Sequence, residues 1–452
     1  MHVLKFGGTS MGDEHTWRQV LDIISRYEHP FVVVSATART TRQLLAAAEK
    51  ALDDIAESRK IAGEIRERHH RLTANFMSHF STAESAAVQE CELWIDEKIA
   101  DLEGYLSEIN KTQKINGRLR DAVASIGEQL SSYLFAKCGT VYGLPAKWVD
   151  AAGIIRTDSE FEQASPDTDF IKQQAERLKK DAQAGKVLIM GGYYGRDTNG
   201  NITTLGFEGS DYTAGLMGAA LSAETIEIWT DVSGIYTCDP RMIPTAHPIP
   251  ELSFQEATEL AYFGAKVLHP STTKPAAQQQ IPILIKNIFE PDQPGTCITA
   301  KTEPNGRAKA LTFKKDCVVI TVTSANTVMG YEFLADVFNI LKTHHLPVDV
   351  VTTTEASVSI ALEDSSHIEP IVQKIRKRAR VEVKDKQAVI SLIGCGTDEV
   401  QSLVSDVLSA TQGDVLNLIS FSHPKHNLNI VVDQESVLSS VKAIHEQVFS
   451  EK

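Results

Sequence analysis

Short apolar runs that alternate with helical segments limit the fold of this chain more than any other feature of its sequence. Residues 3–6 have a strand-like pattern, a helical pattern follows at about 16–27, and residues 31–34 (FVVV) are wholly apolar. Unbroken apolar runs of this kind are typical of parallel strands that helices cover on both faces. The start of the chain is therefore predicted to be α/β.

The same alternation continues to about residue 290. Further strands are predicted at Ala146–Val149, Val187–Met190, Glu227–Thr230 and Ile283–Lys286, and helices at about 130–138, 169–183 and 212–220. Residues 43–108 are polar, helical in pattern and without a strand candidate, so we expect a helical excursion at the edge of the sheet. Asn199-Gly200 predicts a hairpin between residues 193–196 and 202–205.

A turn-rich segment, EPDQPG at residues 290–295, marks a domain boundary near residue 300. Beyond it the sequence repeats itself at an offset of about 70 residues, because SVSIA at 357–361 corresponds to NLNIV at 427–431. Each copy reads strand, helix, strand, strand, which is too small for a core of its own and is expected to pair with its sister. The predicted domains are an α/β domain at 1–300 and two α+β domains at 301–386 and 387–452, and a return of the final strand to the first of these two is left open as an alternative.

The composition excludes several classes of partner. A net charge of −14 repels polyanions, so we expect neither nucleic acid nor an anionic membrane as a partner, and a small anionic substrate needs a local basic pocket. No apolar run reaches the roughly 18 residues of a membrane helix, and the start of the chain lacks the pattern of a secretory signal, so a cytoplasmic location is expected. The six cysteines have neither disulfide nor zinc-site spacing.

Three segments carry residues suited to phosphate chemistry. KFGGTS at 5–10 places a lysine at a strand end before two glycines, where backbone N–H groups approach phosphate oxygens, although such a turn is as often purely structural. GFEGSDYTA at 206–214 leads into a helix, for which Ser210 or Asp211 is alternatively a plain N-cap. WTDVSGIYTCDPR at 229–241 combines a strand end, a turn, a tyrosine and an arginine, the parts needed to hold a nucleotide.

Together with YFGAKVLHP at 262–270, these segments resemble the signatures of aspartate kinases, and the resemblance covers the whole chain in order. It implies the amino acid kinase fold, a mostly parallel sheet flanked by helices, followed by two ferredoxin-like ACT domains. The chain is also similar to the kinase half of the bifunctional aspartokinase/homoserine dehydrogenases. Because it stops at residue 452, a monofunctional enzyme is expected.

The resemblance implies transfer of the γ-phosphoryl of ATP to the β-carboxylate of L-aspartate, the first step of lysine, threonine and methionine biosynthesis. Lys5 would stabilise the transferred phosphoryl, Asp211 would organise Lys5 and the substrate, and Glu128 would bind the substrate ammonium unless it is merely an exposed helix residue. The other implied contacts are Ser35, Thr41 and Gly209 for aspartate, and Lys5, Gly7, Gly8, Ser210, Thr230, Asp231, Tyr236, Arg241, Lys266 and Val267 for ATP. Mg²⁺ is expected to arrive on ATP without protein side chains as ligands.

One position departs from the family pattern. Most members have an arginine, which grips a substrate carboxylate, where this chain has Phe207. Losing a charge-assisted pair of about 1.5–3 kcal/mol would raise the KM for aspartate about tenfold or more, so a replacement is expected. We assign Arg39, in the loop that carries Ser35 and Thr41, as that replacement, and the alternative is that Arg39 and Arg42 are solvated loop charges.

The ACT pair implies an amino-acid effector and a homodimer or larger assembly. Residues 333–338 and 348–355 resemble the lysine-sensitive type, which favours lysine as effector and leaves threonine open. The implied effector contacts are Phe333, Leu334, Asp349, Thr354 and Glu355. Asp349 would accept the effector's ammonium, unless it merely caps a strand end.

Three other interpretations remain. The basic run at 374–380 suggests a nucleic-acid patch, but a solvated helix face explains it better. A regulatory protein with an inactive kinase domain is disfavoured because Lys5, Glu128 and Asp211 are retained. An amino acid kinase acting on glutamate or an acetylated amino acid is the nearer alternative.

Overall fold

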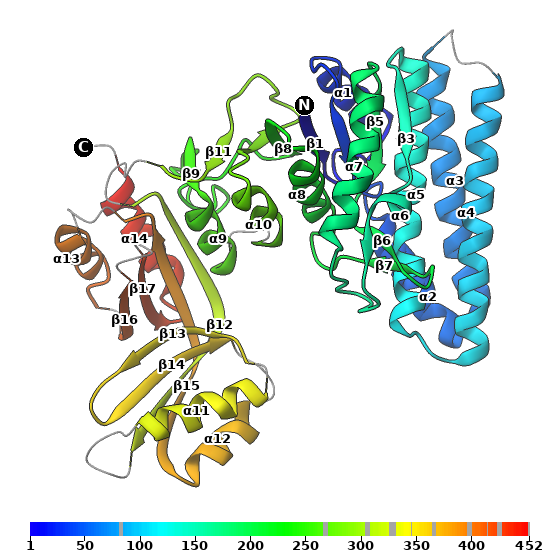
Figure 1. Ribbon diagram of the computed structural model, residues 1–452. Helices are drawn as coiled ribbons and strands as arrows, with labels where there is room; N and C mark the ends of the chain where they lie inside the picture. The colour runs from blue at the N-terminus through cyan, green and yellow to red at the C-terminus, as the bar shows by residue number, and fades with distance from the viewer. Residues whose placement is uncertain are drawn as a thin grey trace. The chain divides into compact units, whose positions relative to one another are not determined.

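The computed structural model describes residues 1–80, 85–264, 270–302, 308–324, 331–344, 346–363, 368–395, 400–413, 415–422 and 427–450 (Figure 1). The chain divides into two compact units. Unit 1 comprises residues 1–235 and 268–300, and unit 2 comprises residues 236–267 and 301–452. One division falls between residues 300 and 301, and the segment 236–267 groups with the C-terminal part of the chain.

A mostly parallel sheet forms the centre of unit 1. Its strands are β1 (His2–Phe6), β2 (Phe31–Val34), β3 (Ala146–Val149), β5 (Val187–Gly191), β8 (Thr225–Thr230), β10 (Ile283–Asn287) and β11 (Thr296–Thr299). They lie in the order β3-β5-β2-β1-β8-β10-β11, with β10–β11 antiparallel and the other neighbouring pairs parallel. The strands predicted from apolar runs are confirmed. The strand order changes direction beside β1, and ligands of such sheets bind at the carboxyl ends of the strands at this point.

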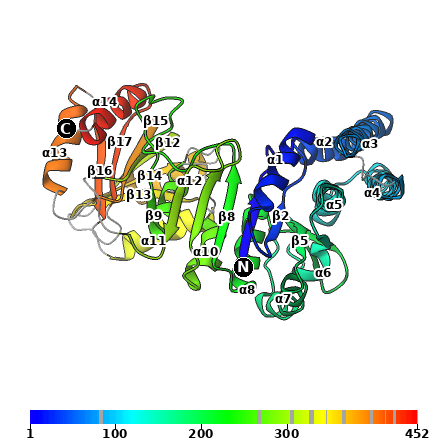
Figure 2. The same ribbon diagram turned by 90° about the horizontal axis from the view of Figure 1, so that it is seen from above.

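Helices cover this sheet in layers (Figure 2). They are α1 (Glu14–Ile24), α2 (Thr40–Asp53), α3 (Ile55–Ser78), α4 (Ser85–Thr112), α5 (Gly117–Tyr142), α6 (Ala151–Ile154), α7 (Thr168–Gln183), α8 (Gly209–Leu221) and α10 (Pro270–Gln278). Helix α5 packs on β2, β3 and β5, and α2, α3 and α4 pack on α5. The prediction of a helical excursion at the sheet edge is therefore wrong. Most of α5 between Leu119 and Gly139 is buried, so it needs the excursion as a cover on the side away from the sheet.

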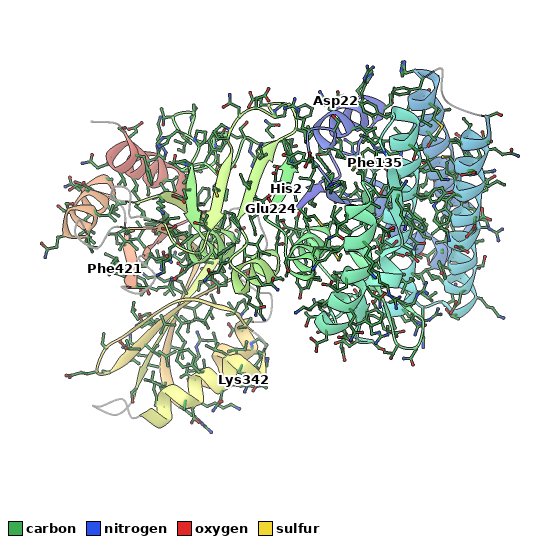
Figure 3. All side chains as sticks on the ribbon, turned by 45° about the horizontal axis from the view of Figure 1, so that its top comes forward. His2, Asp22, Phe135, Glu224, Lys342 and Phe421 are labelled. Carbon is green, nitrogen blue, oxygen red and sulfur yellow. The ribbon has the colours of Figure 1, made fainter. Side chains whose placement is uncertain are left out.

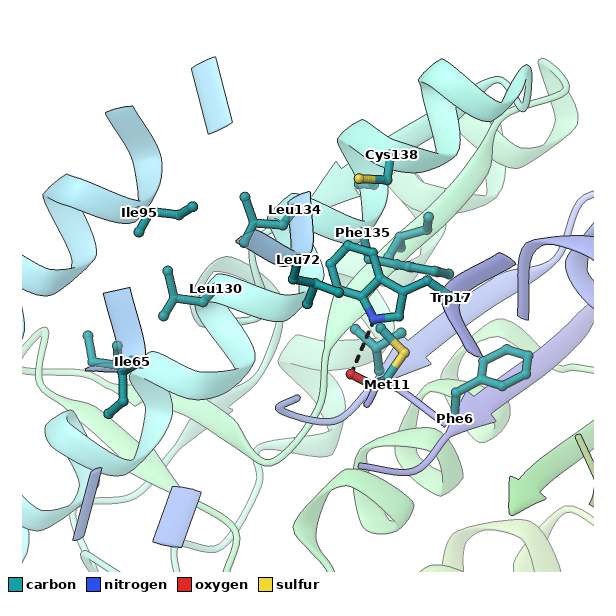
Figure 4. Packing of buried hydrophobic residues seen from close by; sticks show 14 of the residues in the cluster. Phe6, Met11, Trp17, Ile65, Leu72, Ile95, Leu130, Leu134, Phe135 and Cys138 are labelled. Atoms are coloured by element: carbon teal, nitrogen blue, oxygen red, sulfur yellow. Dashed lines mark hydrogen bonds between the residues drawn. The ribbon is translucent and has the colours of Figure 1, made fainter. Parts of the chain in front are cut away.

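Aromatic side chains join these layers (Figure 4). The Trp17 indole of α1 donates a hydrogen bond to the Met11 carbonyl at 3.2 Å. Its ring contacts Phe76 of α3 and Phe135 of α5, with centroids 6.2 and 5.4 Å apart. The turn after β1 is thereby fixed to the helical layers.

The first residues of the chain are tied to β8. His2 Nδ1 lies 2.8 Å from Thr225 Oγ1, and His2 Nε2 lies 3.9 Å from Glu224 Oε2 (Figure 3). The N-terminal ammonium pairs with the same glutamate. These contacts hold the register of β1 against β8, and so the position of Lys5.

A small second sheet lies next to α5 in unit 1. It contains β4 (Arg156–Thr157), β6 (Tyr194–Asp197) and β7 (Ile202–Thr204). Strands β6 and β7 are antiparallel, so the hairpin predicted at Asn199-Gly200 is confirmed. Gly200 has φ of 89°, which a side chain would disfavour.

Unit 2 contains the predicted repeat. After β9 (Glu251–Ser253) and α9 (Phe254–Tyr262), the two copies are β12 (Ala310–Ser324), α11 (Tyr331–Thr343), β13 (Val348–Thr353), β14 (Ser357–Glu363), α12 (Ile368–Arg376), and β15 (Ala379–Ile393), α13 (Val400–Ala410), β16 (Leu416–Ser422), β17 (Asn427–Asp433), α14 (Val437–Phe449). They share one sheet in the order β13-β14-β12-β15-β17-β16. Residues 310–314 at the start of β12 pair with 389–393, and Leu311 packs in the core of the second copy. In the same way, Ala379 and Val381 of β15 pack in the core of the first copy, so β12 and β15 both serve the two copies.

Within the described parts of the chain, no helix combines the length and apolarity needed to cross a membrane.

Candidate active site

Lys5 and Asp211 form an ion pair where β1 meets the first turn of α8. Lys5 Nζ lies 2.5 Å from Asp211 Oδ1, and the two residues are only 7% and 8% exposed. A carboxylate in the first turn of a helix is favoured by the helix dipole, and it holds the lysine ammonium at the end of the strand. The structure thus brings together the two residues assigned to catalysis.

Glycines allow α8 to approach the sheet this closely. A Cβ atom on Gly192, after β5, would lie 2.7 Å from Ser210 Cα, and one on Gly209 would lie 2.8 Å from the Tyr193 ring. Both distances are shorter than any real contact, so the site requires glycine at these positions. Gly191-Gly192 directly follows the apolar run 187–190, a signal that the sequence analysis did not use.

Glu128 lies well inside α5 and is only 4% exposed, so it is not an exposed helix residue. Burial raises the pKa of its carboxyl group to about 8, although the Ala36 backbone N–H and Lys5 act in the opposite direction. Its Oε2 has no hydrogen-bond partner among the described residues. The buried oxygen is therefore an acceptor that a cationic group of a ligand would satisfy.

One cavity of about 450 Å³ joins these groups. It is lined by Lys5, Ser35, Thr41, Leu45, Arg120, Asp121, Glu128, Glu162, Tyr193, Thr204, Gly206, Phe207, Glu208, Gly209, Ser210 and Asp211. All residues assigned to aspartate lie among them except Arg39. Arg39 is exposed at the N-terminal end of α2, with φ of 67°. Phe207, where the resemblance implies an arginine in other members, is 77% exposed.

Asp121 was not predicted, yet it fixes one wall of the cavity. Its carboxylate accepts hydrogen bonds from the Glu162 backbone N–H at 2.9 Å, the Thr204 backbone N–H at 2.8 Å and the Thr204 hydroxyl at 2.7 Å. These bonds attach the loop before α7 and strand β7 to α5. The same loop carries the Glu162 carboxylate, which lies 3.3 Å from Arg120 Nε.

Helix α3 fixes the loop that carries Ser35 and Thr41. His69 is completely buried, which lowers its pKa to about 4, and its Nε2 lies 3.0 Å from the Thr37 hydroxyl. Arg68 donates to the Ala38 carbonyl at 3.1 Å. No local sequence pattern indicates these contacts, because they join residues about thirty positions apart.

Some residues assigned to ATP lie at the carboxyl ends of β1 and β8. Gly7 and Gly8 follow β1, and Thr230 is the last residue of β8. Ser210 is in the first turn of α8, and Asp231 is exposed. Of the others, Tyr236 and Arg241 belong to unit 2, where Arg241 pairs with Asp239 at 2.7 Å, and Lys266 and Val267 lie outside the described residues.

The effector candidates surround the first copy of the repeat in unit 2. Asp349 lies within β13, not at a strand end that it caps, and its side chain has no exposed surface. Lys314 Nζ lies 3.1 Å from Asp349 and 3.0 Å from Glu363. Phe333 and Leu334 of α11 pack on the core of this copy, whereas Thr354 and Glu355 are exposed in the turn after β13. Lys314 was not predicted from the sequence.

Comparison with known proteins identifies the family. The amino acid kinase family matches residues 1–287. Lysine-sensitive aspartokinase 3 of Escherichia coli (strain K12) is 32% identical over 99% of both chains, and aspartokinase 1, chloroplastic, of Arabidopsis thaliana is 34% identical over 99% of this chain and 80% of its own length. The chain belongs to the aspartokinase family.

Two solved structures of E. coli aspartokinase III match this chain over its whole length. The crystal structure of E. coli aspartokinase III with aspartate and ADP (R-state) is 31% identical, with a TM-score of 0.82 over 100% of both chains. The structure of that enzyme with lysine and aspartate (T-state) is 30% identical, with a TM-score of 0.79 over 100% of both chains. This aspartokinase is accordingly an aspartate kinase (EC 2.7.2.4) of amino-acid biosynthesis, with an amino acid kinase domain and a C-terminal regulatory region that has the paired ACT architecture.

Proposed function

We propose that this aspartokinase transfers the γ-phosphoryl of MgATP to the β-carboxylate of L-aspartate at the cavity formed by Lys5, Glu128 and Asp211, giving 4-phospho-L-aspartate. The observation that supports this most is the placement of the Lys5–Asp211 pair and the buried Glu128 around one cavity. The attacking carboxylate is ionised at neutral pH and needs no general base. Positioning and charge neutralisation are therefore the work of the protein.

Each side chain has a role that follows from its charge and burial. Lys5, held by Asp211, neutralises negative charge on the transferred phosphoryl. The Glu128 carboxylate pairs with the substrate's α-ammonium, and Ser35 and Thr41 donate or accept hydrogen bonds at the cavity wall. The backbone at Gly7, Gly8 and the start of α8 offers N–H groups to the phosphates of the nucleotide.

The metal ion enters this proposal only as part of the nucleotide. Among the described residues, no three or more His, Cys, Asp or Glu side chains are grouped to hold a metal ion. Delivery of Mg²⁺ on the phosphates of ATP stays a prediction.

Substrate profiling tests the proposed reaction. ADP release is measured with L-aspartate, L-glutamate and N-acetylglutamate, and the acyl phosphate is trapped with hydroxylamine. N-acetylglutamate has no ammonium group for Glu128, and glutamate holds its side-chain carboxylate one methylene farther from its ammonium. We therefore expect aspartate to have a kcat/KM at least about 100-fold above that of N-acetylglutamate and at least about tenfold above that of glutamate. Higher activity with glutamate or the acetylated amino acid would refute the assignment, and an absence of turnover with all three would support an inactive kinase domain.

We also propose lysine as the inhibitor, since a relative over the full length is named lysine-sensitive. The effector's ammonium would pair with Asp349, whose side chain has no exposed surface and which now forms an ion pair with the partly exposed Lys314. The effector must therefore compete with an ammonium group that belongs to the chain itself.

Two substitutions test this competition. Asp349→Ala is expected to raise the lysine concentration for half-inhibition about tenfold or more, because it removes the acceptor. Lys314→Met is expected to lower that concentration, because it removes the competing cation. The uninhibited kcat should stay within a few-fold in both variants. Inhibition by threonine but not by lysine would refute the choice of effector.

A homodimer formed through unit 2 is part of the proposal. Strands β13 and β16 are the two edges of its sheet, and Ile419 on β16 is 42% exposed. Edge strands with apolar side chains favour pairing with a second chain. Light scattering that gives the mass of a monomer would contradict it.

A cytoplasmic location stays a prediction, since relatives include proteins named as chloroplastic.

A further inference from the structure

The residues assigned so far leave one carboxylate of aspartate without a cationic partner. The substrate carries two carboxylates and one ammonium, and Lys5 is paired with Asp211 and assigned to the phosphoryl group. Phe207 replaces the arginine of other family members and offers no charge. Among the described side chains that line the cavity, the second cation is Arg120.

Arg120 and Glu128 stand on the same helix, α5, and face the same cavity. Eight residues of α-helix rise about 12 Å, a span that the two long side chains and one aspartate molecule between them can bridge. Both charges also act on the Tyr193 hydroxyl. The pKa of Tyr193 is raised to about 12, mainly by burial and also by the charge of Glu128, while a hydrogen bond with Thr204 and the charge of Arg120 act in the opposite direction. Tyr193 lines the same cavity as both groups.

The contact of Arg120 with Glu162 orients its guanidinium group and still leaves donors that can bind an anion. Its Nε lies 3.3 Å from the Glu162 carboxylate, and its side chain is 43% exposed. A guanidinium has five N–H donors, so an ion pair through Nε leaves the two terminal nitrogens for a bidentate contact with a second carboxylate. Asp121 in turn fixes the backbone of Glu162.

We propose that Arg120 binds the α-carboxylate of aspartate and so replaces the arginine that is missing at position 207. This inference rests on the proposed phosphorylation of aspartate. It places the α-ammonium toward Glu128 and the α-carboxylate toward Arg120, which leaves the β-carboxylate for the phosphoryl group near Lys5. Arg39, the residue assigned from the sequence, has no part in this contact.

Steady-state kinetics of Arg120→Ala and Arg120→Gln test the assignment. We expect the KM for aspartate to rise at least about tenfold in both variants, with the KM for ATP within about twofold of the wild-type value. Arg118→Ala is the matched control, since Arg118 stands two residues earlier on α5, pairs with Glu108 and does not line the cavity. Arg39→Ala is the second comparison, and it should leave aspartate saturation unchanged. A tenfold effect of Arg39→Ala without one of Arg120→Ala would overturn the proposal.

A substrate analogue separates recognition from a structural effect. The α-amide of aspartic acid keeps the β-carboxylate and the ammonium but lacks the α-carboxylate. The wild-type enzyme should prefer aspartate to this amide, and Arg120→Ala should lose most of that preference. A variant that is merely less well folded would lower activity with both compounds and keep their ratio, which would refute the contact.

The reverse substitution completes the test. Phe207→Arg in the Arg120→Ala background should recover part of the aspartate affinity, because it restores a cation on the other side of the same cavity. Wild-type enzyme that does not phosphorylate aspartate would defeat the proposed function itself. Wild-type activity with an unchanged preference in the Arg120 variants would defeat only this inference.

Discussion

Replacing Lys5 with alanine is expected to lower kcat by roughly two orders of magnitude or more, with little change in the affinity for ATP. The ammonium is nearly buried and is held by Asp211 where the β-carboxylate must meet the phosphoryl group. In such a water-poor site its charge stabilises the transition state more than the bound nucleotide, so kcat rather than ATP binding should suffer. Turnover at saturating substrates and a direct titration with ATP would measure the two effects separately.

A control is needed because the substitution also leaves Asp211 without its partner in a nearly buried position. Lys5→Arg keeps the charge but changes its shape, and it should retain the fold while losing much of the activity. Lys147→Ala removes an exposed lysine of β3 that pairs with Asp181 and should leave kcat unchanged. Near-normal kcat in Lys5→Ala would remove Lys5 from catalysis.

The sheet could be predicted because its strands are buried on both faces, and this leaves unbroken apolar runs such as residues 31–34. The position of the helical excursion relative to the sheet could not be predicted. It depends on α5, a helix of 26 residues with a long stretch buried between two layers. The sequence of a helix that is apolar on most sides does not indicate which of its faces packs on the sheet. The crossing of β12 and β15 between the two ACT copies was missed for a related reason, since each of these strands has 15 residues and serves two cores at once.

The residues of the candidate site likewise fall into those that the sequence indicated and those that it did not. Lys5, Glu128 and Asp211 were found because each belongs to a local motif beside glycine. Asp121 and Glu162 were not found, because their value comes from hydrogen bonds between segments 41 and 83 residues apart. Arg39 was chosen for its closeness in sequence to Ser35 and Thr41, whereas the arginine that lines the cavity is Arg120, from another helix. Closeness along the chain did not predict closeness in space.

The second large effect is expected on kcat/KM for aspartate and comes from Glu128, since its carboxyl group must be ionised to bind the substrate ammonium. With a pKa of about 8 it is mostly protonated in the free enzyme at pH 7, so aspartate binding expels a proton. Below pH 8, kcat/KM for aspartate should therefore rise about tenfold for each pH unit, and it should level off above. Glu128→Gln should lower kcat/KM by roughly 100-fold at pH 8 and abolish this rising limb. The same limb in the variant, or a flat wild-type profile between pH 6 and about 8, would contradict the role.

The same carboxyl group links folding to pH. Its pKa in the folded chain lies above its ordinary value of 4.5, so the folded state holds the proton more tightly than the unfolded state. This contribution to stability is complete below pH 4.5 and is lost as the pH rises through about 8. Without ligand, the free energy of unfolding of the wild type should consequently fall between these two pH values by more than that of Glu128→Gln. Exposed Glu90→Gln provides the control, because it should follow the wild type. Saturating aspartate should remove the difference at pH 8, since its ammonium then pairs with the ionised carboxylate, and an equal pH dependence in wild type and Glu128→Gln would show that the buried proton is not there.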